Sequence, residues 1–208
     1  MKKAPYVYLS FLFGIILCIL SFWLVRQYLL PQDIPAVGLD ITRPQYATER
    51  DITYCKPGGE PQKLDLYSVE GGNGKKYPAV IYLHGGSWSE GDKSEGDTLQ
   101  YLSLLTRAGY IVASVNYRLL PEYKFPAAVE DAKCAVRFLR ANADQYSIEA
   151  KNIGVIGDSA GGYLAAFLGV SGDEPKFKST EYSDQSDAIQ AVVDLFGPAD
   201  FTLSGGDS

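Results

Sequence analysis

The feature that most constrains the fold is an alternation, from residue 77 onward, of apolar runs of strand length with segments of helical periodicity. Uninterrupted apolar runs of this kind are typical of strands that are buried on both faces of a sheet. Helices between such strands provide the crossover connections that parallel strands require. We therefore expect an α/β fold with a mainly parallel sheet and helices on both faces. The expected strands are 77–86, 110–118 and 189–198, the expected helices are 97–110 and 125–143, and 151–170 reads as strand, turn and helix.

A hairpin is expected ahead of these elements. The strand-like segments 50–55 and 62–69 flank the sequence KPGGEP, whose glycines and prolines favour a turn, so the pair should lie at an edge of the sheet. The helix expected over 125–143 carries apolar residues at steps of three and four positions, which predicts one buried face. Those residues are Val129, Ala132, Val136 and Leu139.

The chain begins with a segment suited to a membrane. From Tyr6 to Val25 it runs for twenty residues without a charge, and a helix of that length spans the roughly 30 Å hydrocarbon core of a bilayer. A cleaved signal peptide is the alternative, but its apolar part is usually about 7 to 15 residues long and ends in a small-x-small site. We expect residues 1–26 to be a membrane anchor or signal sequence, 27–46 a linker, and 47–208 the globular domain.

Basic residues set the expected orientation. Lys2, Lys3 and the amino terminus precede the apolar run, whereas only Arg26 closely follows it. The globular domain should therefore lie outside the cytoplasm, either anchored to the membrane or secreted after cleavage. A disulfide between Cys55 and Cys134 is permitted there, although spacing alone does not establish one.

Composition argues against several functions. The chain holds 19 basic and 25 acidic side chains, with a net charge of -6 and no basic stripe, so we expect no nucleic-acid partner. One histidine and three cysteines, one of them inside the apolar run, are too few for a metal site. We expect no metal and no cofactor, and the sequence leaves the oligomeric state open.

A serine motif, GDSAG, occupies residues 157–161 between an expected strand and an expected helix. A nucleophilic serine on such a turn has a strained backbone, and side chains two residues to either side would collide, which gives Gly157 and Gly161 a steric purpose. A glycine-rich turn that merely connects two elements is the other interpretation. The strand-turn-helix setting favours Ser159 as a nucleophile.

The sequence HGG at 84–86 ends the earlier apolar run 77–86 and supplies a second part of such a site. Acyl transfer needs backbone N–H donors aimed at the developing oxyanion. Gly85, Gly86 and Ala160 would provide them. His84 precedes the serine, whereas the base of this architecture follows it, so we interpret the histidine as a structural brace of the oxyanion loop. No other histidine is present to act as the base.

Four longer segments carry a resemblance to a known group of enzymes. They are HGGSWSEGDKS, VNYRLLPEYKFPAAVEDAKCAVRFLRANA, NIGVIGDSAGGYLAA and VVDLFGPADF. From about Asp51 to Asp200 the chain resembles the α/β-hydrolases of the hormone-sensitive-lipase and feruloyl-esterase-like group of carboxylesterases. The resemblance implies the α/β-hydrolase fold, with the nucleophile and oxyanion donors named above. It also implies a catalytic aspartate and histidine on loops after later strands, which this sequence does not include.

Three explanations fit that departure. We expect a truncated piece of a working esterase, inactive by itself, because the chain stops soon after the strand 189–198 and would leave it as an open apolar edge. A catalytically inactive interaction protein with the hydrolase fold is the second explanation. A membrane-tethered binding protein with an incidental GDSAG is the third, and the intact oxyanion loop counts against it.

Several acidic residues have a structural and a catalytic interpretation. Asp131 and Asp158 suggest a carboxylate pair, but similar proteins lead us to expect an ion pair of Asp131 with Arg118 or a cap on local backbone. Asp194 and Asp200 follow the serine in the chain. Neither occupies the position of the catalytic acid, which belongs to a later strand.

The expected reaction is two-step acyl transfer. Ser159 attacks an ester carbonyl, an acyl-enzyme forms, and water releases the acid. Small acyl esters, lipids and acylated polysaccharides are all candidate substrates, since analogy at the level of the fold does not fix specificity. Trp88 and Tyr163 either line the acyl or alcohol pocket or pack against the core.

Overall fold

The computed structural model describes residues 46–69, 74–95 and 98–201. No helix within these ranges is long and apolar enough to cross a membrane. The apolar run 6–25, for which we predicted an anchor or a signal sequence, lies outside the described residues, as does almost all of the linker.

The strands of the described residues form one sheet. They are β1 Tyr46–Cys55, β2 Gln62–Val69, β3 Tyr77–Leu83, β4 Ile111–Val115, β5 Ile148–Asp158 and β6 Ala191–Leu195. Their order across the sheet is β1-β2-β4-β3-β5-β6. β3, β4, β5 and β6 run parallel, whereas β1 and β2 form an antiparallel hairpin that joins the sheet through β4. The predictions of a mainly parallel sheet and of an edge hairpin are confirmed.

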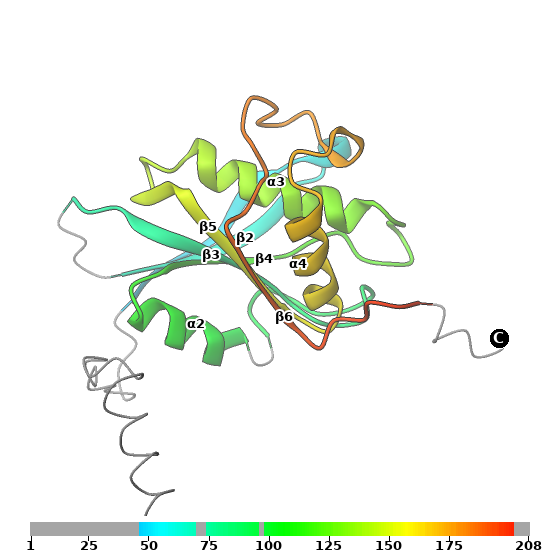
Figure 1. The fold of residues 1–208 in the computed structure, drawn as a ribbon, viewed down its shortest axis with the longest axis horizontal. Coiled ribbons are helices and arrows are strands. Elements are labelled where there is room, and N and C mark those ends of the chain that lie inside the picture. Colours follow the sequence, from blue (N-terminus) through cyan, green and yellow to red (C-terminus); the bar gives the residue numbers. More distant parts are fainter. Residues whose placement is uncertain (1–45, 70–73, 96–97, 202–208) are drawn as a thin grey trace, which may run out of the picture. The chain divides into compact units, whose positions relative to one another are not determined.

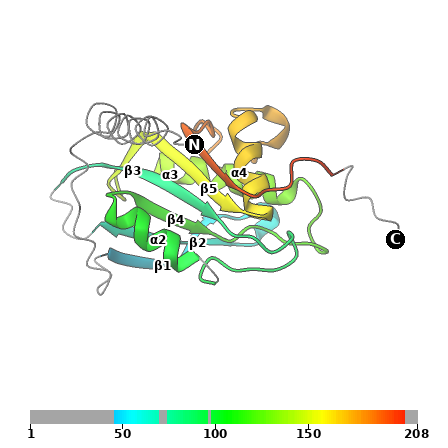
Figure 2. The ribbon, with the colours of Figure 1, turned by 60° about the horizontal axis from the view of Figure 1, so that its bottom comes forward.

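Helices cover both faces of this sheet. They are α2 Thr98–Arg107, α3 Ala127–Ala141 and α4 Ala160–Val170, with short 3-10 helices η1 Pro57–Gly59 and η2 Pro175–Phe177. Figure 1 shows α2 on one side of the sheet and α3 and α4 on the other, and Figure 2 shows the strands and helices from a second direction. α2 packs on β2 and β4, α3 on β1, β3 and β5, and α4 on β3, β5 and β6. Most of the buried apolar side chains lie between the sheet and the α3 and α4 layer.

α3 is buried more completely than its periodicity predicts. The four apolar residues of the expected face are buried, but so are Lys133 and Arg137. Lys133 Nζ lies 2.6 Å from Asp187 Oδ1, Arg137 Nη1 lies 2.8 Å from Asp187 Oδ2, and all three side chains are 0% exposed. Asp187 belongs to the segment 171–190 between α4 and β6. The prediction of a single buried face was wrong because this segment packs on the helix, where Asp187 pairs with both cations.

Candidate active site

Two sequence motifs meet at the carboxyl ends of neighbouring parallel strands. β3 and β5 pair with Leu83 opposite Gly157. The HGG sequence that follows β3 and the GDSAG sequence that ends β5 therefore lie at the same edge of the sheet. In open α/β sheets ligands bind in the crevice outside this edge.

Ser159 joins β5 to α4 in an unusual backbone conformation. Its φ is 50° and its ψ is -115°, values that cost a non-glycine residue about 1–3 kcal/mol. The surrounding chain holds it there: Ser159 N donates to Leu195 O of β6 at 2.9 Å, and Tyr163 N donates to Ser159 O at 3.0 Å. The serine is thus fixed between a strand and a helix, on the turn where the motif predicts a nucleophile.

Gly157 and Gly161 leave no room for side chains. A Cβ on Gly157 would collide with the backbone carbonyl of Gly161, and a Cβ on Gly161 would collide with Leu83 O and lie 2.6 Å from His84 O. Both obstacles are backbone atoms, which cannot move without opening the turn. The steric purpose predicted for these glycines is present in the structure.

The loop after β3 packs against this turn. A Cβ on Gly85 would collide with the carboxylate of Asp158, and a Cβ on Gly86, whose φ is 117°, would collide with Glu90 O. Gly86 O accepts hydrogen bonds from Ser89 N at 2.9 Å and from Glu90 N at 3.0 Å. Residues 84–95, called the oxyanion loop below, therefore fold back on themselves beside the serine.

His84 is enclosed within this loop. It is 4% exposed, its ring stacks on Tyr117 at a centroid distance of 4.4 Å, and its Nδ1 lies 2.7 Å from Gly85 O. A carbonyl oxygen only accepts, so Nδ1 carries the proton. Burial lowers the pKa of His84, which favours the neutral ring. Nε2 is buried and has no hydrogen-bond partner among the described residues, so neither ring nitrogen bonds Ser159.

Sequence reasoning missed three residues that support the site. Gly91, with a φ of 104°, packs so closely on the His84 ring that a Cβ would collide with Nδ1. Tyr117 donates from its hydroxyl to His84 O at 2.7 Å. Tyr82 donates to Asp158 Oδ1 at 2.6 Å and thereby holds the residue before the serine. The third glycine of HGGSWSEG was a usable signal for Gly91, whereas the two tyrosines had none beyond their place in the expected strands 77–86 and 110–118.

Asp131 and Asp194 take part in structural hydrogen bonds. Arg118 Nε lies 2.9 Å from Asp131 Oδ2 and Arg118 N donates to the same oxygen at 2.8 Å, as expected. Burial raises the pKa of Asp131, and the hydrogen bonds from Arg118 offset only part of that effect. Asp194 Oδ1 accepts from Gly197 N at 2.7 Å, which fixes the turn after β6.

Trp88 and Tyr163 line a cavity of about 300 Å³ with mostly apolar walls. Their rings meet edge to face at a centroid distance of 5.5 Å. Trp88 comes from the oxyanion loop and Tyr163 from the first turn of α4, so the cavity is bounded by both motif-bearing segments. The other lining residues are Arg118, Leu120, Tyr123, Phe125, Pro126, Ala128, Val129, Leu164 and Phe201.

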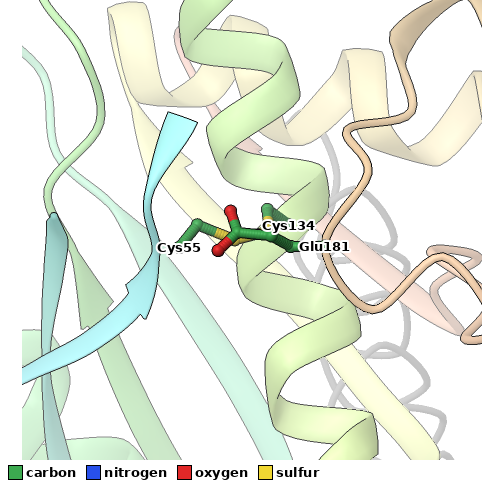
Figure 3. Close-up of side chains that lie close together, drawn as sticks. All are labelled: Cys55, Cys134 and Glu181. Carbon is green, nitrogen blue, oxygen red and sulfur yellow. A yellow bond between two sulfur atoms is a disulfide. The ribbon is translucent and has the colours of Figure 1, made fainter. Parts of the chain in front are cut away.

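Cys55 and Cys134 form a disulfide between the end of β1 and α3, with Cα atoms 6.5 Å apart. Figure 3 shows this disulfide with Glu181, which has a carboxylate oxygen within 4.8 Å of both sulfurs. Lys56 N donates to both Glu181 carboxylate oxygens, at 3.1 and 2.8 Å. Thiolates bind metals and disulfide sulfurs do not, so we assign no metal to this group.

A strained serine between strand and helix, beside a glycine loop that follows an earlier strand of a mainly parallel sheet, defines an α/β-hydrolase. The comparisons with known proteins agree. The chain matches the BD-FAE family over residues 64–207 and belongs to that family. Esterase LipC of Mycobacterium tuberculosis (strain ATCC 25618 / H37Rv) is 30% identical to it over 173 residues, which are 82% of this chain and 42% of LipC.

Solved structures of esterases have the same fold. A truncated form of a carbohydrate esterase from gut microbiota is 29% identical, with a TM-score of 0.69, over 77% of this chain and 60% of that one. EstE1, a thermophilic carboxylesterase cloned from a metagenomic library, is 36% identical, with a TM-score of 0.54, over 63% of this chain and 43% of its own. The chain is thus homologous to carboxylic ester hydrolases.

The homology covers only part of these relatives. The alignments to three esterases of Mycobacterium tuberculosis span 42%, 36% and 37% of their lengths. The chain therefore spans less than half of the length of these relatives.

Proposed function

We propose that this chain carries the nucleophile and the oxyanion hole of a carboxylic ester hydrolase that forms an acyl-enzyme on Ser159. The backbone of Ser159 carries the proposal. A non-glycine residue at φ 50° and ψ -115° persists only where the surrounding structure imposes it. Such imposed strain supports a serine held ready for reaction rather than a simple connecting turn.

The neighbouring backbone suits the charge that the reaction develops. When Ser159 Oγ attacks the ester carbonyl, the carbonyl oxygen becomes an oxyanion. Ala160 is the first residue of α4, so its N–H has no intrahelical acceptor and lies at the positive end of the helix dipole. Gly85 and Gly86 would provide the other donors. The oxyanion then collapses to the acyl-enzyme as the alcohol leaves with a proton, and water releases the acid.

The base is not assigned within this chain. His84 is the sole histidine of the sequence, and it is buried beneath Tyr117 with Nδ1 engaged by Gly85 O. We therefore expect the chain by itself to be inert, and we apply the proposal to the complete product of the gene. The engaged histidine also favours a second candidate, a catalytically inactive hydrolase-fold protein that binds a partner.

For the substrate we infer an ester of a carbohydrate or a small alcohol. The similarity to a carbohydrate esterase from gut microbiota supports the carbohydrate. The apolar cavity beside Trp88 and Tyr163 supports an apolar substituent on the ester. Comparing kcat/KM for acetylated xylan and for p-nitrophenyl acetate would show whether the site prefers a carbohydrate ester or the ester of a small hydroxyl compound.

We further propose that the domain works outside the cytoplasm, anchored through residues 1–26 or secreted after their cleavage. The disulfide between Cys55 and Cys134 supports this, because disulfides persist in oxidising compartments. An anchored protein should pellet with membranes and resist alkaline carbonate extraction. A soluble form beginning at about residue 30 would instead show cleavage of a signal peptide.

A fluorophosphonate probe tests the nucleophile. In the complete gene product we expect labelling on Ser159, and loss of both labelling and ester hydrolysis in Ser159→Ala. Ser147 is a matched control, since it also has a positive φ, of 56°, but lies before β5 rather than after it. Ser147→Ala should label as the wild type does. A folded wild type that is not labelled and hydrolyses no ester would contradict the hydrolase function and favour the catalytically inactive binding protein.

A further inference from the structure

The oxyanion loop is fixed at its far end by a buried lysine. Lys93 is 7% exposed, and its Nζ lies 3.1 Å from Asp51 Oδ1 and 3.1 Å from Asp65 Oδ1. Both aspartates belong to the β1–β2 hairpin, which β4 separates from β3 in the sheet. The lysine thus connects the loop after β3 to a different part of the sheet.

The main chain of Lys93 is held as firmly as its side chain. Lys93 N donates to Asn116 Oδ1 at 2.5 Å, and Lys93 O accepts from Ser114 Oγ at 2.6 Å. Asn116 Nδ2 also donates to Asp92 Oδ2 at 2.7 Å. Burial opposes the charge on the lysine, but hydrogen bonds to the two hairpin carboxylates outweigh it and raise the pKa of Lys93. Lys93 is therefore protonated and carries a positive charge.

Close contacts within the loop connect Lys93 to the proposed oxyanion donors. Two residues before Lys93, Gly91 packs on the His84 ring, and a Cβ there would lie 2.6 Å from Gly85 O. Glu90 precedes Gly91, and its backbone N–H donates to Gly86 O at 3.0 Å. A shift of the loop at Lys93 would therefore displace the peptide units of Gly85 and Gly86.

We propose that Lys93 is a positioning residue of the oxyanion hole: its ion pairs with Asp51 and Asp65 hold the loop so that the N–H groups of Gly85 and Gly86 face the carbonyl oxygen of a bound ester. The inference rests on the function proposed for this loop. A salt bridge that only stabilised the fold would affect folding and leave turnover by the folded enzyme unchanged.

Steady-state kinetics of Lys93→Met in the complete gene product tests the proposal. Because preorganised donors act mainly in the transition state, we expect kcat to fall about tenfold or more, with KM changed by less than about threefold. Lys76→Met is the matched control. It removes another Lys–Asp pair, in which Lys76 Nζ lies 2.5 Å from Asp144 Oδ1, but these side chains are 52% and 93% exposed. Its kcat should equal that of the wild type.

A double variant separates positioning from stability. Lys93→Met alone leaves the buried carboxylate of Asp65 with the more distant and exposed Arg50, whose Nη1 lies 3.5 Å from Asp65 Oδ2, in place of the buried lysine, which lowers the free energy of unfolding. Adding Asp65→Asn removes that charge and keeps an acceptor for Asp51 N, which donates to Asp65 Oδ1 at 2.9 Å. We expect the double variant to regain stability while its kcat stays low.

Each outcome decides the question. A folded Lys93→Met with the wild-type kcat, or a double variant that regains kcat together with stability, overturns the positioning role while ester hydrolysis by the wild type stands. A wild-type product that hydrolyses no ester and is not labelled on Ser159 overturns the proposed function, and the positioning role falls with it.

Discussion

Replacing Ser159 with glycine should leave the protein more stable than replacing it with alanine. Both substitutions remove the hydroxyl, and the Ser159 side chain makes no capping hydrogen bond that either variant would lose differently. They differ in the backbone. Alanine keeps a Cβ at φ 50° and ψ -115°, whereas glycine adopts such angles without steric cost.

The size of the difference follows from two opposing effects. Relief of the strain at Ser159 stabilises the glycine variant by about 1–3 kcal/mol. The greater freedom of glycine in the unfolded chain removes about 0.5–1 kcal/mol of that gain. We expect a net difference of about 1 kcal/mol in favour of glycine, which raises Tm by about 2–4 °C for a domain of this size.

Equilibrium urea unfolding, followed by far-UV circular dichroism, measures this difference. Ser171 provides the control pair, because it lies at the other end of α4 with an ordinary φ of -122°. There, Ser171→Ala should be at least as stable as Ser171→Gly. If Ser159→Ala is favoured over Ser159→Gly by as much as Ser171→Ala is over Ser171→Gly, the backbone at Ser159 is not strained and the main support for the nucleophile is lost.

Three further predictions concern the loop and the disulfide. Gly86→Val should lower kcat by about a hundredfold or more, the scale of losing one oxyanion donor, because a Cβ there collides with Glu90 O; an unchanged kcat in steady-state assays would contradict this. Burial lowers the pKa of His84 from 6.5, so the unfolded chain takes up a proton first and the free energy of unfolding should fall as the pH drops below about 6.5. Urea titrations at about pH 7.5 and 5.5 measure this, and equal midpoints would refute it. Reduction of the Cys55–Cys134 disulfide, which joins residues 79 positions apart, should cost about 2–4 kcal/mol of stability; dithiothreitol should shift the urea midpoint of the wild type but not of Cys134→Ala.

The parts of the fold and site that follow local rules could be predicted from the sequence. Apolar runs of strand length and helical periodicities between them predicted the mainly parallel sheet, because the spacing of apolar residues within a segment indicates which of its faces are buried. Gly157 and Gly161 could be identified since the turn around Ser159 is a five-residue feature with its own steric demands. Once β3 and β5 are neighbours, the meeting of HGG with GDSAG follows.

The charged supports of the site could not be predicted in this way. Lys93 and Asp65 lie 28 positions apart, and Lys133 and Asp187 lie 54 positions apart. A lysine in a polar stretch is normally exposed, and only the tertiary fold supplies the carboxylate that makes its burial tolerable. The Cys55–Cys134 disulfide stayed open at the level of the sequence for the same reason, since the sequence permitted the pairing but only the contact of β1 with α3 brings the two sulfurs together.

The supports around Ser159 also bear on how the site would work. Strain persists only where several contacts impose it, and here they come from separate elements: Leu195 O of β6 holds the serine N–H, α4 holds its carbonyl, and Gly161 packs on the backbone of His84. All of these contacts lie within the present chain, and none involves a general base. The serine and the oxyanion loop are therefore preorganised independently of the base. A base that reaches Ser159 would meet a side chain already in place, so substitution of that base should abolish proton transfer without altering the turn around Ser159. The stability difference between Ser159→Gly and Ser159→Ala should therefore be the same with or without the base.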